Sequence, residues 1–200
     1  SIGAFNFSLA HTPNMDQLAA TGLVFKRAYV QYAFCAPSRN SFMSGRRPDT
    51  TRVWNFINDF RQEFPFHQSF PQYFKGHNYS TSGHGKLYHP NHPKNFDEPL
   101  SWSQNASSAE NPSTSYPYYK RDSGKSKDCG YFDVCPTGNG TSASDPKLGG
   151  RDQFVDHHTV TEVMGTMDAW AKDARRPFFI GVGLIRPHLP FIVPEDTWAQ

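Results

Sequence analysis

The chain has 200 residues, of which 36% are hydrophobic and 15% aromatic. That is enough apolar side chain for the core of one ordinary domain, and it excludes a wholly disordered chain. The 20 basic and 18 acidic residues leave a formal net charge of +2, which argues against a nucleic-acid binder driven by bulk charge. No apolar run approaches the roughly 20 residues needed to span a bilayer.

The first elements expected along the chain are a helix and a buried strand. Thr12 can cap a helix in which Pro13 takes the first position and which Gly22 ends. The apolar face of this helix is expected to consist of Met15, Leu18 and Ala19. The run LVFKRAYV, residues 23–30, is typical of a buried strand.

Two short helices and a second strand follow. Pro37 suits the first position of a helix that ends at Gly45, and SFPQYFKGHN, residues 69–78, predicts another helix. Its inward side chains are expected to be Phe70, Tyr73 and Phe74. The segment 79–90, YSTSGHGKLYHP, predicts a strand followed by a loop. Residues 91–150 are rich in Ser, Pro, Asn and Gly, which predicts an irregular surface excursion whose aromatics can still pack.

The last third of the chain has the clearest pattern. Thr159 and Glu162 predict a capping box at the start of a helix that Pro177 ends. Its apolar positions are Val160, Val163, Met164, Met167, Trp170 and Ala171. The run FFIGVGL, 178–184, is typical of a central parallel strand. Because helices and strands alternate, the class is predicted to be α/β.

Three polar segments follow predicted strands: Cys35, residues 83–89, and His188. Ligands of parallel α/β sheets bind beyond the carboxyl ends of the strands, so these segments could converge at one edge. Cys35 begins a helix with Arg39 one turn on, which favours an anion and would acidify the thiol. From this chemistry alone, a reactive and a structural cysteine are equally supported.

The other candidates each have a structural alternative. Lys86 is flanked by glycine and can approach a sulfate- or phosphate-like oxyanion, although a solvated lysine with His89 in a surface loop is the commoner outcome. His188, between two prolines, suits acid–base work or a substrate contact, but could equally be satisfied by backbone carbonyls. Nothing in the sequence places His84, His157 or His158 in the site.

Two features favour the secretory pathway. Glycosylation acceptors of the type Asn-x-Ser/Thr occur at Asn6, Asn78, Asn105 and Asn139. Cys129 and Cys135 lie close together in CGYFDVC, which suits a short-loop disulfide, with metal binding as the alternative. A disulfide from Cys35 to either of them would also be possible, although the close pair is the simpler match.

The stretch CAPSRNSFMSGR, from Cys35 to Arg46, resembles the sulfatase signature Cys-x-Pro-Ser-Arg followed by Gly-Arg. The Gly-Lys pair with His89 shortly after, and His188 in its Pro-rich turn, resemble the second and third motifs of that family in the same order. The resemblance covers nearly the whole chain except residues 91–150. It implies an alkaline-phosphatase/sulfatase-like sheet sandwiched by helices and incomplete here, with residues 1–200 as part of a single N-terminal catalytic domain.

The resemblance also implies the chemistry. In the family this cysteine, here Cys35, is oxidised to formylglycine by a formylglycine-generating enzyme, which reads the positions of Pro37 and Arg39. The hydrated aldehyde offers one hydroxyl to attack sulfur and a second to expel sulfate. A bound Ca²⁺ polarises the sulfate, with formylglycine 35 among its ligands. The resemblance assigns Lys86 and His188 to the sulfate ester, His89 to the diol, and Arg39 to the formylglycine and the charges of the metal site.

Part of the family's pattern has no match in residues 1–200. The paired Asp of the first strand, the later Asp-His metal pair and a second lysine are absent, and Asp16 and Asp49 lie in helix and turn contexts. The remaining metal ligands are therefore expected outside this chain, and residues 1–200 alone are expected to bind Ca²⁺ poorly and to show no turnover.

The substrate that the resemblance suggests is a sulfated glycosaminoglycan, specifically 2-O-sulfated iduronate of heparan or dermatan sulfate, in a lysosomal or secreted protein. Two alternatives stay open: a phosphonate or phosphate monoester hydrolase of the same superfamily, and a non-catalytic module that holds sulfated glycans. The glycan-binding module would use Arg46, Arg47, Lys86 and Arg186.

Overall fold

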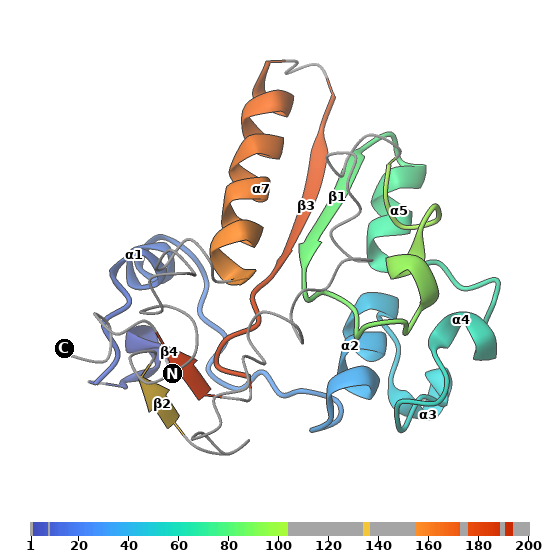
Figure 1. Ribbon diagram of the computed structural model, residues 1–200, viewed down its shortest axis with the longest axis horizontal. Coiled ribbons are helices and arrows are strands. Elements are labelled where there is room, and N and C mark those ends of the chain that lie inside the picture. Colours follow the sequence, from blue (N-terminus) through green and yellow to red (C-terminus); the bar gives the residue numbers. More distant parts are fainter. Residues whose placement is uncertain are drawn as a thin grey trace. The chain divides into compact units, whose positions relative to one another are not determined.

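The computed structural model describes residues 2–7, 9–103, 134–136, 155–172, 176–188 and 191–193 (Figure 1). The chain divides into two compact units, Ser1–Gln31 and Tyr32–Gln200, which we describe separately.

The first unit contains a 3₁₀ turn, η1 (Gly3–Phe5), and a helix, α1 (Pro13–Thr21). The helix has the predicted bounds, but Thr12 does not cap it. The Thr12 hydroxyl instead accepts from the Gly3 N–H at 2.9 Å and donates to the Asp16 carboxylate at 3.1 Å. Its oxygen therefore stabilises the turn that precedes the helix and does not accept a hydrogen bond from the backbone N–H groups of the first helical turn.

Two expectations for this unit are wrong. Helix α1 has no buried residue, and Leu18 on its expected inward face is 72% exposed. Residues 23–30 form no strand, and Leu23 and Tyr29 are exposed. A buried strand needs neighbouring strands and a covering layer, and the described part of this unit supplies only a turn and one short helix.

The second unit confirms the α/β class, because both of its strand pairs are parallel: β1 with β3, and β2 with β4. In chain order its elements are α2 (Cys35–Ser44), α3 (Pro48–Thr51), α4 (Phe60–Glu63), α5 (Phe70–Gly76), β1 (Ser80–Gly85), η2 (Lys94–Asp97), β2 (Val134–Pro136), α7 (Val155–Ala171), β3 (Phe178–Gly183) and β4 (Phe191–Val193).

Helices α5 and α7 cover opposite faces of the β1–β3 pair (Figure 1). Adjacent residues of a strand point to opposite faces, and the rings of β3 follow this rule. Phe178 contacts Trp170 of α7 at a centroid distance of 5.8 Å, whereas Phe179 stacks on Phe74 of α5 at 5.0 Å. The expected sheet between helices is therefore present in this part of the chain.

Both predicted short helices are present; α2 ends as predicted, whereas α5 ends at Gly76, two residues before the predicted end. Helix α2 begins at Cys35, so Pro37 is its third residue, and it stops at Gly45 in the left-handed region (φ 65°). In α5, Phe70 and Phe74 both contact Phe179 of β3, whereas Tyr73 packs on His77. Phe70 and Tyr73 are each about half exposed, so neither points fully inward as expected. Residues four apart share a helix face, so the Tyr73–His77 pair belongs to a different face from the Phe70–Phe74 pair.

Helix α7 begins four residues before the predicted capping box, so Thr159 and Glu162 lie inside it and the predicted cap is wrong. The buried face consists of Thr159, Val163 and Thr166, whereas the predicted apolar positions Val160, Met164 and Met167 are exposed. Polar and small groups are buried because this face meets β1: the Thr166 hydroxyl lies 3.3 Å from His84 Nε2, and the Thr159 methyl group abuts Gly85.

The core of the second unit is a cluster of six buried side chains: Met43, Phe60, Leu87, Tyr88, Phe96 and Trp102. Phe96 and Trp102 come from the start of the expected excursion, so its aromatics do pack where they are described. Apart from residues 91–103 and β2, the excursion lies outside the described residues. The boundaries 1–200 and 91–150 stay predictions.

Candidate active site

Cys35 is the first residue of α2 and is half-buried. Its thiol forms no disulfide within the part of the chain that the structure describes. One turn later, Arg39 directs its Nε–H to the Cys35 sulfur at 3.3 Å. The predicted proximity of thiol and guanidinium follows from residues i and i+4 sharing a helix face.

Arg39 also joins α2 to the loop that follows β1. Its Nη1 donates to the backbone carbonyl of Lys86 and, at 3.1 Å, to that of Leu87. One guanidinium therefore contacts both the sulfur and the backbone beside the candidate lysine. A lysine at position 39 could not make these contacts together, because its ammonium is a single compact group. The planar guanidinium of arginine carries several N–H donors in fixed directions.

Lys86 is only 1% exposed, so the alternative of a solvated surface lysine is wrong. Its ammonium lies close enough to the Cys35 side chain for that group to affect its pKa. Burial lowers the pKa of Lys86, negative charge on the Cys35 side chain opposes this shift, and the positive charge of Arg39 adds to it. The structure therefore places two basic groups against the Cys35 side chain.

Close approach of β1 and β3 fixes the backbone of Lys86. The Lys86 N–H donates to the Gly183 carbonyl at 2.6 Å. A Cβ at Gly183 would overlap the Lys86 carbonyl, and one at Gly85, whose φ is +68°, would overlap Gly183. Only glycine accommodates both the approach and the left-handed backbone.

His89 lies in the same loop and is kept neutral. Burial lowers the pKa of His89 to about 4; the hydrogen bond to the Pro90 carbonyl opposes this shift, and the charges of Lys86, His92 and Arg39 add to it. The Phe56 ring packs on the imidazole at a centroid distance of 4.6 Å. This contact could not be predicted from the sequence, since no local pattern links Phe56 to His89.

His188 lies in the turn after β3, beyond the same carboxyl edge that precedes Lys86. Its N–H donates to the Ile185 carbonyl at 3.0 Å, and its carbonyl accepts from Arg186 Nη1 at 2.6 Å. The Asp156 carboxylate of α7 accepts from the N–H groups of Ile185 and Arg186 at 2.7 and 3.0 Å. Asp156 thus positions this loop, and the only sequence signal for it was an acidic residue near a helix start.

The modification sites are described only in part. Asn6 and Asn78 are exposed, as an acceptor of glycan must be. Asn105, Asn139 and Cys129 lie outside the described residues, as does the side chain of Cys135, so the expected disulfide stays a prediction.

The expected calcium site is not assembled by the described residues. Within ranges 2–7, 9–103, 156–172 and 176–188, no group of three or more His, Cys, Asp or Glu side chains could hold a metal ion. Cys35, as formylglycine, stays the one ligand predicted for this chain. No described helix is both long enough and apolar enough to cross a membrane.

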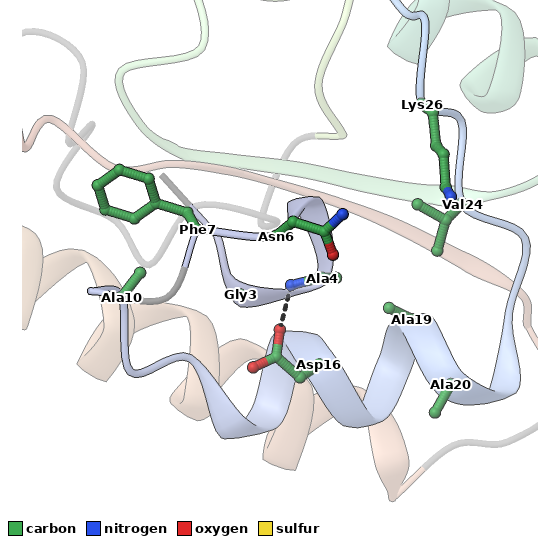
Figure 2. Close-up of a pocket in the computed structure, with 10 residues that line it drawn as sticks. All are labelled: Gly3, Ala4, Asn6, Phe7, Ala10, Asp16, Ala19, Ala20, Val24 and Lys26. Carbon is green, nitrogen blue, oxygen red and sulfur yellow. Dashed lines mark hydrogen bonds between the residues drawn. The ribbon is translucent and has the colours of Figure 1, made fainter.

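The first unit has a pocket of its own, with a volume of about 740 Å³ (Figure 2). Asp16 projects toward it and accepts a hydrogen bond from the Ala4 N–H at 2.7 Å. None of the predicted catalytic residues lines it. The lining residues are Gly3, Ala4, Asn6, Phe7, Ala10, Asp16, Ala19, Ala20, Val24 and Lys26.

Known proteins are similar to this chain over nearly its whole length. The chain is 34% identical to iduronate 2-sulfatase of Mus musculus and to that of Homo sapiens, in each case over 98% of this chain and 34% of the relative. It is 30% identical to a sulfatase of Formosa agariphila, over 95% of this chain and 37% of the relative. The chain therefore spans about a third of the length of these relatives.

A sequence model of the sulfatase family matches residues 1–199. The parallel strands and covering helices described above are accordingly part of an alkaline-phosphatase-like α/β fold. The chain belongs to the sulfatase family.

Proposed function

We propose that the protein carrying this chain hydrolyses sulfate esters of a sulfated glycan, with Cys35 as the precursor of its nucleophile. The observation that carries the proposal is the contact of the Cys35 side chain with Arg39, together with the buried Lys86, whose pKa the Cys35 side chain affects. Two cationic side chains and a helix N-terminus together form a local site for an anion in a chain of nearly balanced charge.

Formylglycine at position 35 would supply the chemistry. Its hydrate has two hydroxyls on one carbon: one displaces the alcohol from sulfur, and the other expels sulfate as the aldehyde re-forms. A serine or an unmodified thiol lacks the second hydroxyl. Pro37 and Arg39 stand at the positions that a formylglycine-generating enzyme reads, which makes that enzyme the proposed partner.

The neighbouring residues have roles that their surroundings support. Lys86 and Arg39 stabilise negative charge on the sulfate and on the position 35 side chain. Their electrostatic interactions are strong because the buried site excludes most water. His89, neutral above about pH 4, is in the form that can accept a proton from the diol. His188, held beyond the same strand edge, contacts the ester and assists the leaving group.

Calcium stays part of the proposal as the family's metal. The described residues do not assemble a site for it, and the roles given above belong to side chains of this chain alone.

Two finer assignments follow from the relatives and the sequons. The name iduronate 2-sulfatase, carried by two relatives, supports 2-O-sulfated iduronate of heparan or dermatan sulfate as the substrate. The exposed acceptors Asn6 and Asn78 support glycosylation, and with it a lysosomal or secreted protein.

The test has two measurements on the protein made in a eukaryotic secretory host. The tryptic peptide with Cys35 is expected to be about 18 Da lighter than the thiol form, since formylglycine replaces SH by an aldehyde oxygen. Sulfate release from a 2-O-sulfated disaccharide is expected to exceed hydrolysis of phosphate and phosphonate esters. An unmodified thiol with sulfated-glycan binding alone would favour the non-catalytic module, and faster phosphonate cleavage would favour the other hydrolase class.

A further inference from the structure

Four aromatic side chains form an exposed surface beside the candidate site. We call it the aromatic platform, and it consists of Tyr32, Phe34, Trp54 and Phe56. The rings pair across two segments: Tyr32 with Trp54 at a centroid distance of 5.5 Å, and Phe34 with Phe56 at 4.4 Å.

Each segment supplies one ring to each pair. The two aromatics of a segment are two positions apart, and the chain bends at 33–34 and at 55–57. Phe34 itself has extended dihedrals (φ −146°, ψ 141°). The rings of Tyr32 and Trp54 meet edge-on, and those of Phe34 and Phe56 are tilted.

The platform is continuous with the candidate site. Phe34 directly precedes Cys35 and is the N-cap residue of α2. Phe56 packs on the His89 imidazole. A molecule lying on the rings would therefore have one end next to the position 35 side chain and to the histidine proposed to act on it.

The platform also remains exposed although it is aromatic. Phe34 and Trp54 are 45% and 44% exposed, whereas the nearby core ring of Phe60 is fully buried. Contiguous exposed apolar surface of this kind commonly marks a ligand-binding site. Aromatic rings suit a ligand that has an apolar face and polar edges, because the ring face offers dispersion contact and no hydrogen-bonding group that would need a partner.

We infer that the aromatic platform binds the pyranose ring of the sulfated sugar, by stacking the C–H face of the sugar on the ring of Trp54, which Tyr32 contacts edge-on. This inference rests on the proposed sulfatase function and adds the residues that select a sugar over a small alkyl group. The sulfate of the sugar then lies toward Lys86 and Arg39, while its hydroxyl groups remain at the edge of the platform in water.

The experiment compares two substrates in the full-length protein: a 2-O-sulfated disaccharide and a small alkyl sulfate without a ring. Trp54→Ala is expected to raise KM for the disaccharide about five- to tenfold, as loss of one aromatic stacking contact predicts. The kcat of Trp54→Ala for the alkyl sulfate is expected to stay within about twofold of the kcat of the wild-type protein. Trp54→Phe is expected to recover most of the lost affinity. Phe66→Ala, which removes a ring that is 98% exposed, is the matched control and is expected to change neither substrate.

Two outcomes would overturn the inference. One is an equal effect of Trp54→Ala on both substrates, or on neither. The other is a fall in melting temperature for Trp54→Gln, because a face covered by other protein segments, unlike a sugar-binding face, does not accept a polar side chain without loss of stability.

Binding separates failure of the inference from failure of the proposed function. Calorimetry with the same disaccharide on a Cys35→Ala background needs no turnover. Suppose that Trp54→Ala weakens this binding while the wild-type protein, with position 35 intact, releases no sulfate. The inference about the platform then stands and the proposed hydrolase function fails. If the wild-type protein releases sulfate and Trp54→Ala leaves binding unchanged, the inference about the platform is wrong and the hydrolase function stands.

Discussion

Arg61 and Asp97 form a two-point ion pair, with Nε–Oδ1 and Nη2–Oδ2 distances of 2.7 Å each. The pair joins α4 to η2. The Tyr88 hydroxyl lies 3.3 Å from the same carboxylate. Because the Asp97 side chain is 2% exposed and that of Arg61 13%, removing one partner leaves a poorly solvated charge.

Asp97→Asn is therefore expected to lower the free energy of unfolding by about 3 kcal/mol, the usual cost of breaking a buried pair from one side. Urea unfolding measures it. Asp49→Asn, at an exposed carboxylate, is the control and should change stability by less than about 0.5 kcal/mol. A loss as small as the control's would mean that the pair contributes little to the fold.

The close approach of β1 and β3 predicts opposite effects for the same substitution at two glycines. Gly183→Ala is expected to destabilise the protein by about 2 kcal/mol, because the new methyl group overlaps the Lys86 carbonyl. Gly165→Ala, in the interior of α7 with no atom near its Cβ position, is expected to stabilise by about 0.5–1 kcal/mol through helix propensity. Thermal unfolding measures both, and equal signs would contradict the strand geometry.

Lys86→Met tests the role of the buried ammonium. It keeps the length of the side chain and removes the charge beside position 35, so kcat for sulfate release is expected to fall about 10²- to 10³-fold. Lys94→Met, at an exposed lysine, removes the same charge from the surface and should leave kcat unchanged. Retention of kcat in Lys86→Met would remove Lys86 from the proposed site.

His84 predicts acid sensitivity of the fold. Its imidazole is fully buried between Ser82 and Thr166, and Nδ1 lies 3.5 Å from a Glu162 carboxylate oxygen. Burial lowers the pKa of His84, and the nearby Glu162 carboxylate opposes only part of this shift. Below about pH 6.5 an unfolded histidine binds a proton that the folded one resists. The stabilisation by the neutral folded form is therefore complete above that pH and is lost as the pH falls.

Urea midpoints between pH 7 and pH 5 measure this dependence. His84→Gln is expected to flatten the fall in stability with acidification, whereas His11→Gln, at an exposed histidine, should leave it intact. If the urea midpoint changed with pH in the same way in His84→Gln and in the wild-type protein, His84 would not contribute to the acid sensitivity of the fold.

Local signals in the sequence predicted the elements that depend on local chemistry. Gly45 ends α2 because only the residue after the helix needs a left-handed backbone, and a short apolar run was enough to find β3. Cys35 and Arg39 share a helix face, so their contact could also be predicted.

The structural features that could not be predicted from the sequence depend on tertiary packing. The apolar run 23–30 matches a strand by composition, but pairing partners decide whether it forms one, and composition does not report them. In α7 the mismatch arises because β1 presents His84 and Gly85, which require small and polar neighbours. Arg61 and Asp97 meet through tertiary folding alone, so no periodicity could reveal them.

The hydrogen bond from the Lys86 N–H to the Gly183 carbonyl has a consequence for the order of folding. Cys35, Arg39 and Lys86 leave the ribosome well before β3 is synthesised, yet the backbone of Lys86 is fixed only once β3 pairs with β1. The nucleophile position and its lysine therefore come together late, as a contact between distant parts of the chain.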